Sequence, residues 1–133
     1  MPKGAYNRET AVARIFIVDD DESVRDSISS LLRSVGYKTA LFASADAFLN
    51  SDGMREADCL ILDMTMTGLS GLELQSRLDD MGCSIPIIFV TAEADDDLKS
   101  RALKQGAVAL LGKPCDDETL LRAIHSALKP TKS

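Results

Sequence analysis

Short apolar runs alternate with stretches of helical periodicity five times along this chain, and this alternation constrains the fold more than any other feature of the sequence. The run at 57–63, ADCLILD, is apolar on both faces, as a central strand of a parallel sheet is. Apolar strands that alternate with amphipathic helices are typical of parallel sheets with crossover helices. The sequence therefore predicts an α/β fold with a doubly wound, five-stranded parallel sheet.

The limits of the strands and helices follow from the apolar spacing and from residues that start or stop helices. The predicted strands are residues 14–19, 39–43, 57–63, 86–91 and 107–112. Residues that can start or stop a helix lie between these runs: Gly36, Ser44, Ser70, Gly82, the acidic triplet 95–97, Gly106 and Asp116. Each predicted strand is therefore followed by a predicted helix.

Length and charge limit the classes of function. With 133 residues, 45% of them hydrophobic, the chain fits one domain, predicted at 14–129 between an extension at 1–13 and a tail or linker start at 130–133. The net charge of −6 argues against direct binding of nucleic acid, which usually requires a basic face. No apolar run approaches the ~18 residues of a membrane span and the start of the chain lacks the apolar segment of a signal peptide, so we expect a cytoplasmic protein without membrane contact.

Polar or charged residues directly follow four of the predicted strands. Ligands of an open parallel sheet bind beyond the carboxyl ends of the strands, where the strand order reverses. The residues found there are Asp19, Asp20, Asp21, Asp63, Thr91 and Lys113. If the strand order is 2-1-3-4-5, the first and third strands are neighbours about 4.8 Å apart, and their terminal carboxylates lie close together.

Carboxylates crowded in this way repel one another and raise one another's pKa values unless a cation lies among them. Mg²⁺, or Mn²⁺ in its place, suits such a site because hard divalent cations prefer oxygen ligands. Lys113 supplies a second positive charge within reach of the same edge. With a hydroxyl from Thr91, these groups can transfer a phosphoryl group to an aspartate, and Asp63 is the predicted nucleophile.

The residues at these strand ends together resemble the receiver domain of two-component response regulators. The matching elements are VDD after the first strand, DMTMTGLSG at 63–71 against the family's D-x-x-M-P-x-x-x-G, VTA at 90–92, and Lys113-Pro114. The resemblance spans residues 14–129 and is closest to the subgroup with a C-terminal helix-turn-helix output domain. It implies a flavodoxin-like (βα)5 fold with strand order 2-1-3-4-5.

The resemblance also implies roles for individual residues. Asp20, Asp63 and the backbone carbonyl of Thr65 are expected to ligate the Mg²⁺, with Asp19 acting through a water. Thr91, Ala92 and Lys113 are expected to bind the phosphoryl group and to switch with it. The peptide bond between Lys113 and Pro114 is expected to be cis.

Partners and activity follow from the same resemblance. The phosphoryl group is expected to come from a histidine kinase or a phosphotransfer protein, and a homodimer is possible through the fourth helix, fifth strand and fifth helix. The signal then passes on by a conformational population shift. The chain is not expected to be an enzyme, apart from its own phosphorylation and dephosphorylation.

Three residues depart from the family pattern. Thr67 replaces the usual proline of the loop after Asp63, which removes a rigid backbone angle there. Leu110 stands where a tyrosine or phenylalanine commonly turns inward on phosphorylation, and Cys115 stands where phenylalanine is frequent. We therefore expect phosphorylation with a muted or rerouted structural response.

Two other functions fit parts of the sequence. Asp19-Asp20-Asp21-Glu22-Ser23 also reads as the D-x-D-x-S motif of a haloacid-dehalogenase-like phosphatase, in which Asp19 is the nucleophile and Asp21 the acid. That interpretation leaves Asp63 and Lys113 without clear roles. The other alternative is a receiver-like dimerisation module that is never phosphorylated, which the departures at Thr67 and Leu110 support.

Overall fold

The computed structural model describes residues 12–51, 53–66, 68–92 and 95–128, with strands alternating with helices throughout. The strands are β1 (Arg14–Val18), β2 (Lys38–Phe42), β3 (Cys59–Leu62), β4 (Ile87–Thr91) and β5 (Ala109–Gly112). The helices are α2 (Glu22–Ser34), α3 (Ala45–Leu49), the 3₁₀ turn η1 (Met54–Glu56), α4 (Gly71–Asp80), α5 (Asp96–Lys104) and α6 (Asp117–Leu128). Among these described elements, no helix is long and apolar enough to cross a membrane.

The five strands form one parallel sheet in the order β2-β1-β3-β4-β5, which confirms the predicted order. β1 therefore lies between β2 and β3, and the chain reverses its direction of travel across the sheet at β1 and β3. Val18 pairs with Leu62, so the two strands end side by side. Asp19 and Asp63 directly follow these two residues, so the register brings both aspartates to the same edge of the sheet.

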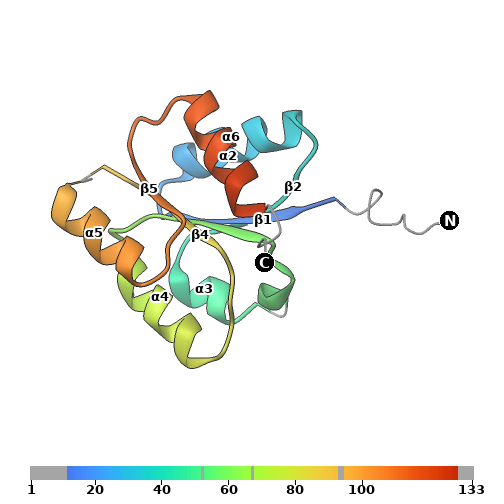
Figure 1. The fold of residues 1–133 in the computed structure, drawn as a ribbon. Coiled ribbons are helices and arrows are strands. Elements are labelled where there is room, and N and C mark those ends of the chain that lie inside the picture. The colour runs from blue at the N-terminus through green and yellow to red at the C-terminus, as the bar shows by residue number, and fades with distance from the viewer. Residues whose placement is uncertain (1–11, 52, 67, 93–94, 129–133) are drawn as a thin grey trace, which may run out of the picture.

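Helices cover both faces of the sheet, with α2 and α6 on one face and α3, α4 and α5 on the other (Figure 1). Because alternate residues of a strand point to opposite faces, each strand contributes to two separate cores. In β1, Phe16 and Val18 pack in the core that includes Phe48 and Leu74, whereas Ile15 and Ile17 pack in the other core. The central strands β3 and β4 are buried along their whole length, as the apolar runs predicted.

The predicted helix starts are confirmed by their caps. Asp21 caps α2 by accepting from the backbone of Ser23 and Val24, and Ser44 caps α3 in the same manner. Ser70, a predicted helix start, forms a capping box with Glu73 at the beginning of α4. α2, α3, α5 and α6 begin within about five residues of the preceding strand, whereas the loop that follows Asp63 separates β3 from α4.

Two strands begin two residues later than the apolar runs predicted. β5 begins at Ala109 because the backbone N–H of Ala107 is already used in closing α5, where it donates to the carbonyl of Ala102. β3 begins at Cys59 because the turn η1 precedes it and the carboxylate of Asp58 accepts from the backbone of Arg14. An apolar run can thus begin before the first ladder hydrogen bond, and hydrophobicity alone does not mark that limit.

Candidate functional site

Two buried aspartates lie directly beyond the ends of neighbouring strands. The backbone N–H of Asp63 donates to the carbonyl of Val18 over 3.0 Å, and that of Asp19 donates to Phe42 over 3.1 Å. These bonds continue the sheet ladders one residue past β1 and β3, so the positions of both residues are fixed by the sheet. Asp19 is 3% exposed and Asp63 is 5% exposed.

Asp20 completes a cluster of acidic groups at this edge. One carboxylate oxygen each from Asp19, Asp20 and Asp63 lie within 4.8 Å of one another. Unlike its two neighbours in the cluster, Asp20 is exposed. All the donor atoms are hard carboxylate oxygens, so the residues present fit a hard divalent cation such as Mg²⁺.

Lys113 reaches this cluster from β5, two strands away from β3. Its Nζ donates to Oδ2 of Asp19 over 2.9 Å and to Oδ2 of Asp63 over 3.4 Å. The Lys113 backbone N–H donates to the carbonyl of Thr91, and the peptide bond to Pro114 is cis. One ammonium group thus contacts two of the three carboxylates.

The surroundings shift the pKa values of both partners upward. Burial raises the pKa of Asp63, and the charge of Asp19 adds to this rise against the opposing charge of Lys113. Burial disfavours the charge of Lys113, but its hydrogen bonds to Asp19 and the charges of both aspartates outweigh burial and raise its pKa. Asp63 is therefore a carboxylate whose negative charge is not fully compensated, and Lys113 is a firmly charged ammonium.

Three further predicted residues lie around the cluster. Thr91, the last residue of β4, is fully buried, and Ala92 directly after it is exposed. Thr65 donates its backbone N–H to Oδ1 of Asp63 over 3.2 Å, which places the loop after β3 against the carboxylate. Thr67 lies outside the described residues.

The predicted switch position Leu110 lies away from the acidic cluster. It is 5% exposed, pairs with Phe89 in the sheet, and packs in the core beneath α4 and α5. The described Leu110 side chain is thus already inside the core, where the family's aromatic residue is expected only after it turns inward.

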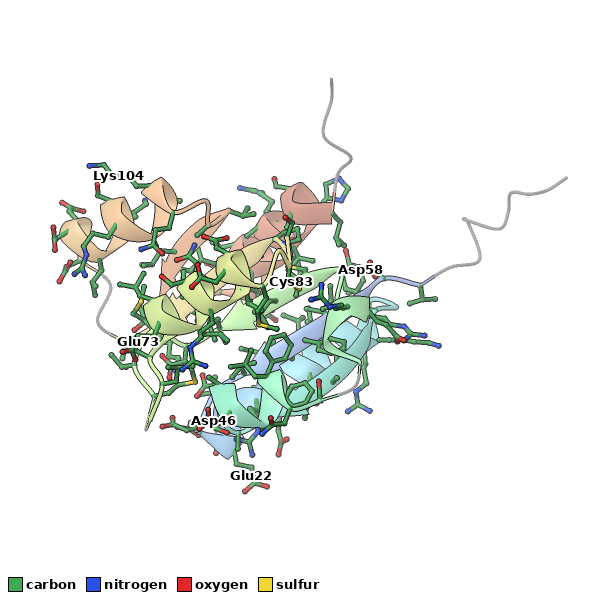
Figure 2. All side chains as sticks on the ribbon, turned by 90° about the horizontal axis from the view of Figure 1, so that it is seen from below. Glu22, Asp46, Asp58, Glu73, Cys83 and Lys104 are labelled. Atoms are coloured by element: carbon green, nitrogen blue, oxygen red, sulfur yellow. The ribbon has the colours of Figure 1, made fainter. Side chains whose placement is uncertain are left out.

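The site lies at the end of the sheet where the helices begin. In Figure 2, Glu22, Asp46 and Glu73 lie toward the lower left, and each stands in the first turn of a helix. Asp58, which precedes β3, lies at the other end of the domain. The acidic cluster belongs to the first of these ends because Asp19 and Asp63 follow their strands.

Two supporting residues were missed by reasoning from sequence. A Cβ atom at Gly71 would lie 2.7 Å from the carbonyl oxygen of Asp63 and 2.9 Å from the Phe89 ring, so only glycine fits there. Its signal was present, because Gly71 is the last residue of the motif DMTMTGLSG. Arg25 donates from Nη1 to the backbone carbonyl of Asp19 over 2.7 Å, and no sequence pattern identified it.

Comparison with known proteins decides the family. The pattern of the response regulator receiver domain matches residues 15–125. The chain belongs to the response regulator receiver domain family. The receiver is 46% identical over 115 residues to the response regulator protein TmoT of Ectopseudomonas mendocina, an alignment that covers 86% of this chain and 52% of TmoT.

Solved structures agree with this assignment. The response regulator StyR is 44% identical with a TM-score of 0.81, covering 89% of this chain and 60% of that chain. The crystal structure of FixJ-N is 31% identical with a TM-score of 0.81, covering 92% of this chain and 98% of that chain. The receiver spans about half the length of the curated relatives it matches, so what the full-length relatives do is a separate question for this chain.

The two alternative functions are not favoured. The phosphatase interpretation requires Asp21 as an acid, but its carboxylate accepts from the backbone of Ser23 and Val24 as the cap of α2. The interpretation as an unphosphorylated module accounts for neither the acidic cluster nor its contact with Lys113, and the relatives are named as response regulators.

Proposed function

We propose that this receiver accepts a phosphoryl group on Asp63 in a Mg²⁺-dependent reaction. The observation that carries the proposal is the contact of one lysine ammonium, Lys113, with Asp19 and Asp63 inside a cluster of three carboxylates. A nucleophilic carboxylate, a fixed cation and a set of oxygen ligands are the parts that phosphoryl transfer to an aspartate requires.

Asp20, Asp63 and the backbone carbonyl of Thr65 would hold the Mg²⁺, or a Mn²⁺ in its place, with Asp19 acting through a water. When bound, the cation supplies charge neutralisation for the carboxylates and for the phosphoryl oxygens. The closeness of the three carboxylates and the raised pKa of Asp63 support this assignment, since crowded carboxylates are costly without a cation.

The protein's own groups then do the rest. A carboxylate oxygen of Asp63 forms the new bond to phosphorus, and the bond from phosphorus to the donor's histidine nitrogen breaks with its electron pair on that nitrogen. Lys113 moves from pairing carboxylates to pairing a phosphoryl oxygen, while the Thr91 hydroxyl and the Ala92 backbone bind other phosphoryl oxygens. Hydrolysis of the acyl phosphate restores Asp63, so chemistry is limited to this cycle.

The phosphodonor is proposed to be a histidine kinase or a phosphotransfer protein. A cavity of about 400 Å³ opens beside Lys113, between α2 and α6, and apolar side chains that include Val24 and Leu120 line it. Lys113 belongs both to this cavity and to the site, which supports the approach of a protein donor from that side.

The setting of the receiver is part of the same proposal. We place the receiver in the cytoplasm, with the domain at 14–129. Residues 130–133 are proposed as the start of a linker to an output domain, because a relative is named as a transcriptional regulatory protein. Homodimer formation through α5, β5 and α6 is the proposed output. Leu103 and Val108, large apolar residues at 40% and 37% exposure, support a contact there.

Mass spectrometry tests the proposal directly. The protein is incubated with Mg²⁺ and a small phosphodonor, and a mass increase of one phosphoryl group is expected for the wild type. Asp63→Asn should show none, and Asp96→Asn, an exposed acidic residue in α5, should label as the wild type does. Equal labelling of Asp63→Asn would refute Asp63 as the acceptor.

A further inference from the structure

Arg25 contacts the main chain between two members of the acidic cluster. It lies in the first turns of α2, is half-buried, and its Nη1 donates to the carbonyl oxygen of Asp19 over 2.7 Å. A guanidinium hydrogen bond to a backbone carbonyl that is partly shielded from water is among the stronger protein hydrogen bonds.

The other polar atoms of Asp19 are also engaged. Its Oδ1 accepts from the backbone N–H of Asp21, its Oδ2 accepts from Lys113, and its N–H donates to Phe42. The carbonyl held by Arg25 belongs to the peptide group that joins Asp19 to Asp20. The orientation of that planar group determines where the chain carries Asp20.

Asp20 depends on this peptide group more than its partners do. Asp19 and Asp63 are buried and held by the sheet ladder, whereas Asp20 is exposed and is not fixed by core packing. Its carboxylate nevertheless lies in the cluster. The contact from Arg25 is therefore placed where it can direct the exposed ligand.

We propose that Arg25 is a positioning residue that orients the Asp19–Asp20 peptide group, so that Asp20 is preorganised for the divalent cation. This inference rests on the proposed Mg²⁺ site. It gives α2 a function beyond packing, because this helix then carries the arginine that holds the backbone of a proposed metal ligand.

Two physical effects of Arg25 oppose each other, and this makes the inference testable. As a cation near a metal site, Arg25 repels Mg²⁺, so its removal would tighten binding. As a positioning group, it preorganises Asp20, so its removal would weaken binding by about tenfold, as loss of outer-shell partners of metal sites commonly does.

The experiment measures the Mg²⁺ dissociation constant by titration calorimetry for the wild type, Arg25→Met and Arg25→Lys. Arg25→Met keeps an unbranched side chain for packing but removes the charge and the donors, and we expect about tenfold weaker binding. Arg25→Lys keeps the charge and one donor group, and it should recover part of the affinity. Tighter or unchanged binding by Arg25→Met would overturn the inference.

Arg33→Met is the matched control. It removes the same charge from the same helix, about 12 Å farther along its axis, from an exposed residue of the last turn. That distance exceeds the screening length of about 10 Å at 0.1 M salt, so its dissociation constant should stay within about twofold of the wild type.

A measurement without metal separates the positioning effect of Arg25 from the effect of its charge on Mg²⁺ binding. Backbone order parameters of Asp20 and Asp21 should fall in metal-free Arg25→Met and should keep their wild-type values in Arg33→Met. Unchanged values in Arg25→Met would overturn the inference, and Arg25→Lys, with a smaller fall, carries the same test if Arg25→Met does not fold. A wild type that binds no Mg²⁺ would overturn the proposed function as well, whereas binding that is equal in wild type and Arg25→Met overturns only the role of Arg25.

Discussion

The chain contains Asp-Asp-Asp twice, at 19–21 and at 95–97, and the structure uses the two triplets differently. In the first, Asp19 is buried at the sheet edge, Asp20 is an exposed member of the acidic cluster, and Asp21 caps α2. In the second, all three residues are exposed, and Asp95 caps α5 while the other two stand in its first turn. Three identical letters thus have three different environments in one place and nearly one environment in the other.

The difference comes from what precedes each triplet. The first directly follows β1, whose ladder is continued by Asp19 and whose neighbour β3 brings Asp63 alongside. In the second, Asp95 to Asp97 lie at the start of a helix, where acidic side chains complement its positive end. Position beyond a strand, rather than density of charge, therefore determines which triplet contributes to the acidic cluster.

The largest expected effect is on Mg²⁺ affinity, when a residue of the first triplet is changed. Asp20→Asn removes one negative oxygen ligand, and we expect Mg²⁺ affinity to fall by more than the roughly 10–100-fold that loss of an outer-shell partner costs. Asp96→Asn, which makes the same change in the other triplet, should leave the dissociation constant unchanged. Calorimetric titration of both variants checks this, and similar losses in the two would show that overall charge sets the affinity.

The second effect concerns the backbone that carries Asp63. Gly71→Ala places a methyl group 2.7 Å from the Asp63 carbonyl oxygen, and overpacking of this kind costs about 1–3 kcal/mol of unfolding free energy. Gly53→Ala is the control, because the nearest atom to its added methyl, Glu56 Oε1, lies at 3.9 Å. Urea denaturation measures both, and a Gly71→Ala protein as stable as Gly53→Ala would contradict the close approach seen here.

The third effect concerns helix capping, the one role that the two triplets share. Asp21 and Asp95 both accept from helix N-terminal backbone N–H groups, so Asp21→Ala and Asp95→Ala should each cost about 1 kcal/mol of stability. Neither substitution removes a member of the acidic cluster, so each variant should still be phosphorylated on Asp63. Loss of labelling in Asp21→Ala alone would restore a chemical role for Asp21 of the kind that the phosphatase interpretation assigned.

The sequence was sufficient for the parallel fold and for the three members of the acidic cluster, because apolar strands and the residues directly after them can be recognised from local patterns. The alternation of apolar runs predicted the parallel sheet, the family resemblance implied its strand order, and the strand ends indicated Asp63 and Lys113. Arg25 could not be found in this way, because its partner is a backbone carbonyl and any residue could supply one. The close fit at Gly71 likewise depends on the Phe89 ring of a strand that lies far away in sequence.

The smallest effect concerns the charge of Asp63 without metal. Burial and the charge of Asp19 raise its pKa in the folded state, so between the unfolded pKa of about 3.9 and this raised value the folded state binds more protons. The free energy of unfolding therefore falls as pH rises through that window. Asp63→Asn lacks this loss and should be the more stable protein at pH 7 in a metal-free buffer.

Thermal unfolding of wild type and Asp63→Asn from pH 4 to pH 7, with a chelator present, measures this difference. The stability advantage of the variant should shrink toward pH 4, where the wild-type carboxyl becomes protonated, and Mg²⁺ should stabilise only the wild type strongly. Asp96→Asn should show no such pH-dependent advantage, because its exposed carboxyl lies outside the cluster. A variant that is less stable than the wild type at every pH would mean that the contact with Lys113 outweighs the crowding of Asp19 and Asp63, and that the cluster is satisfied without a cation.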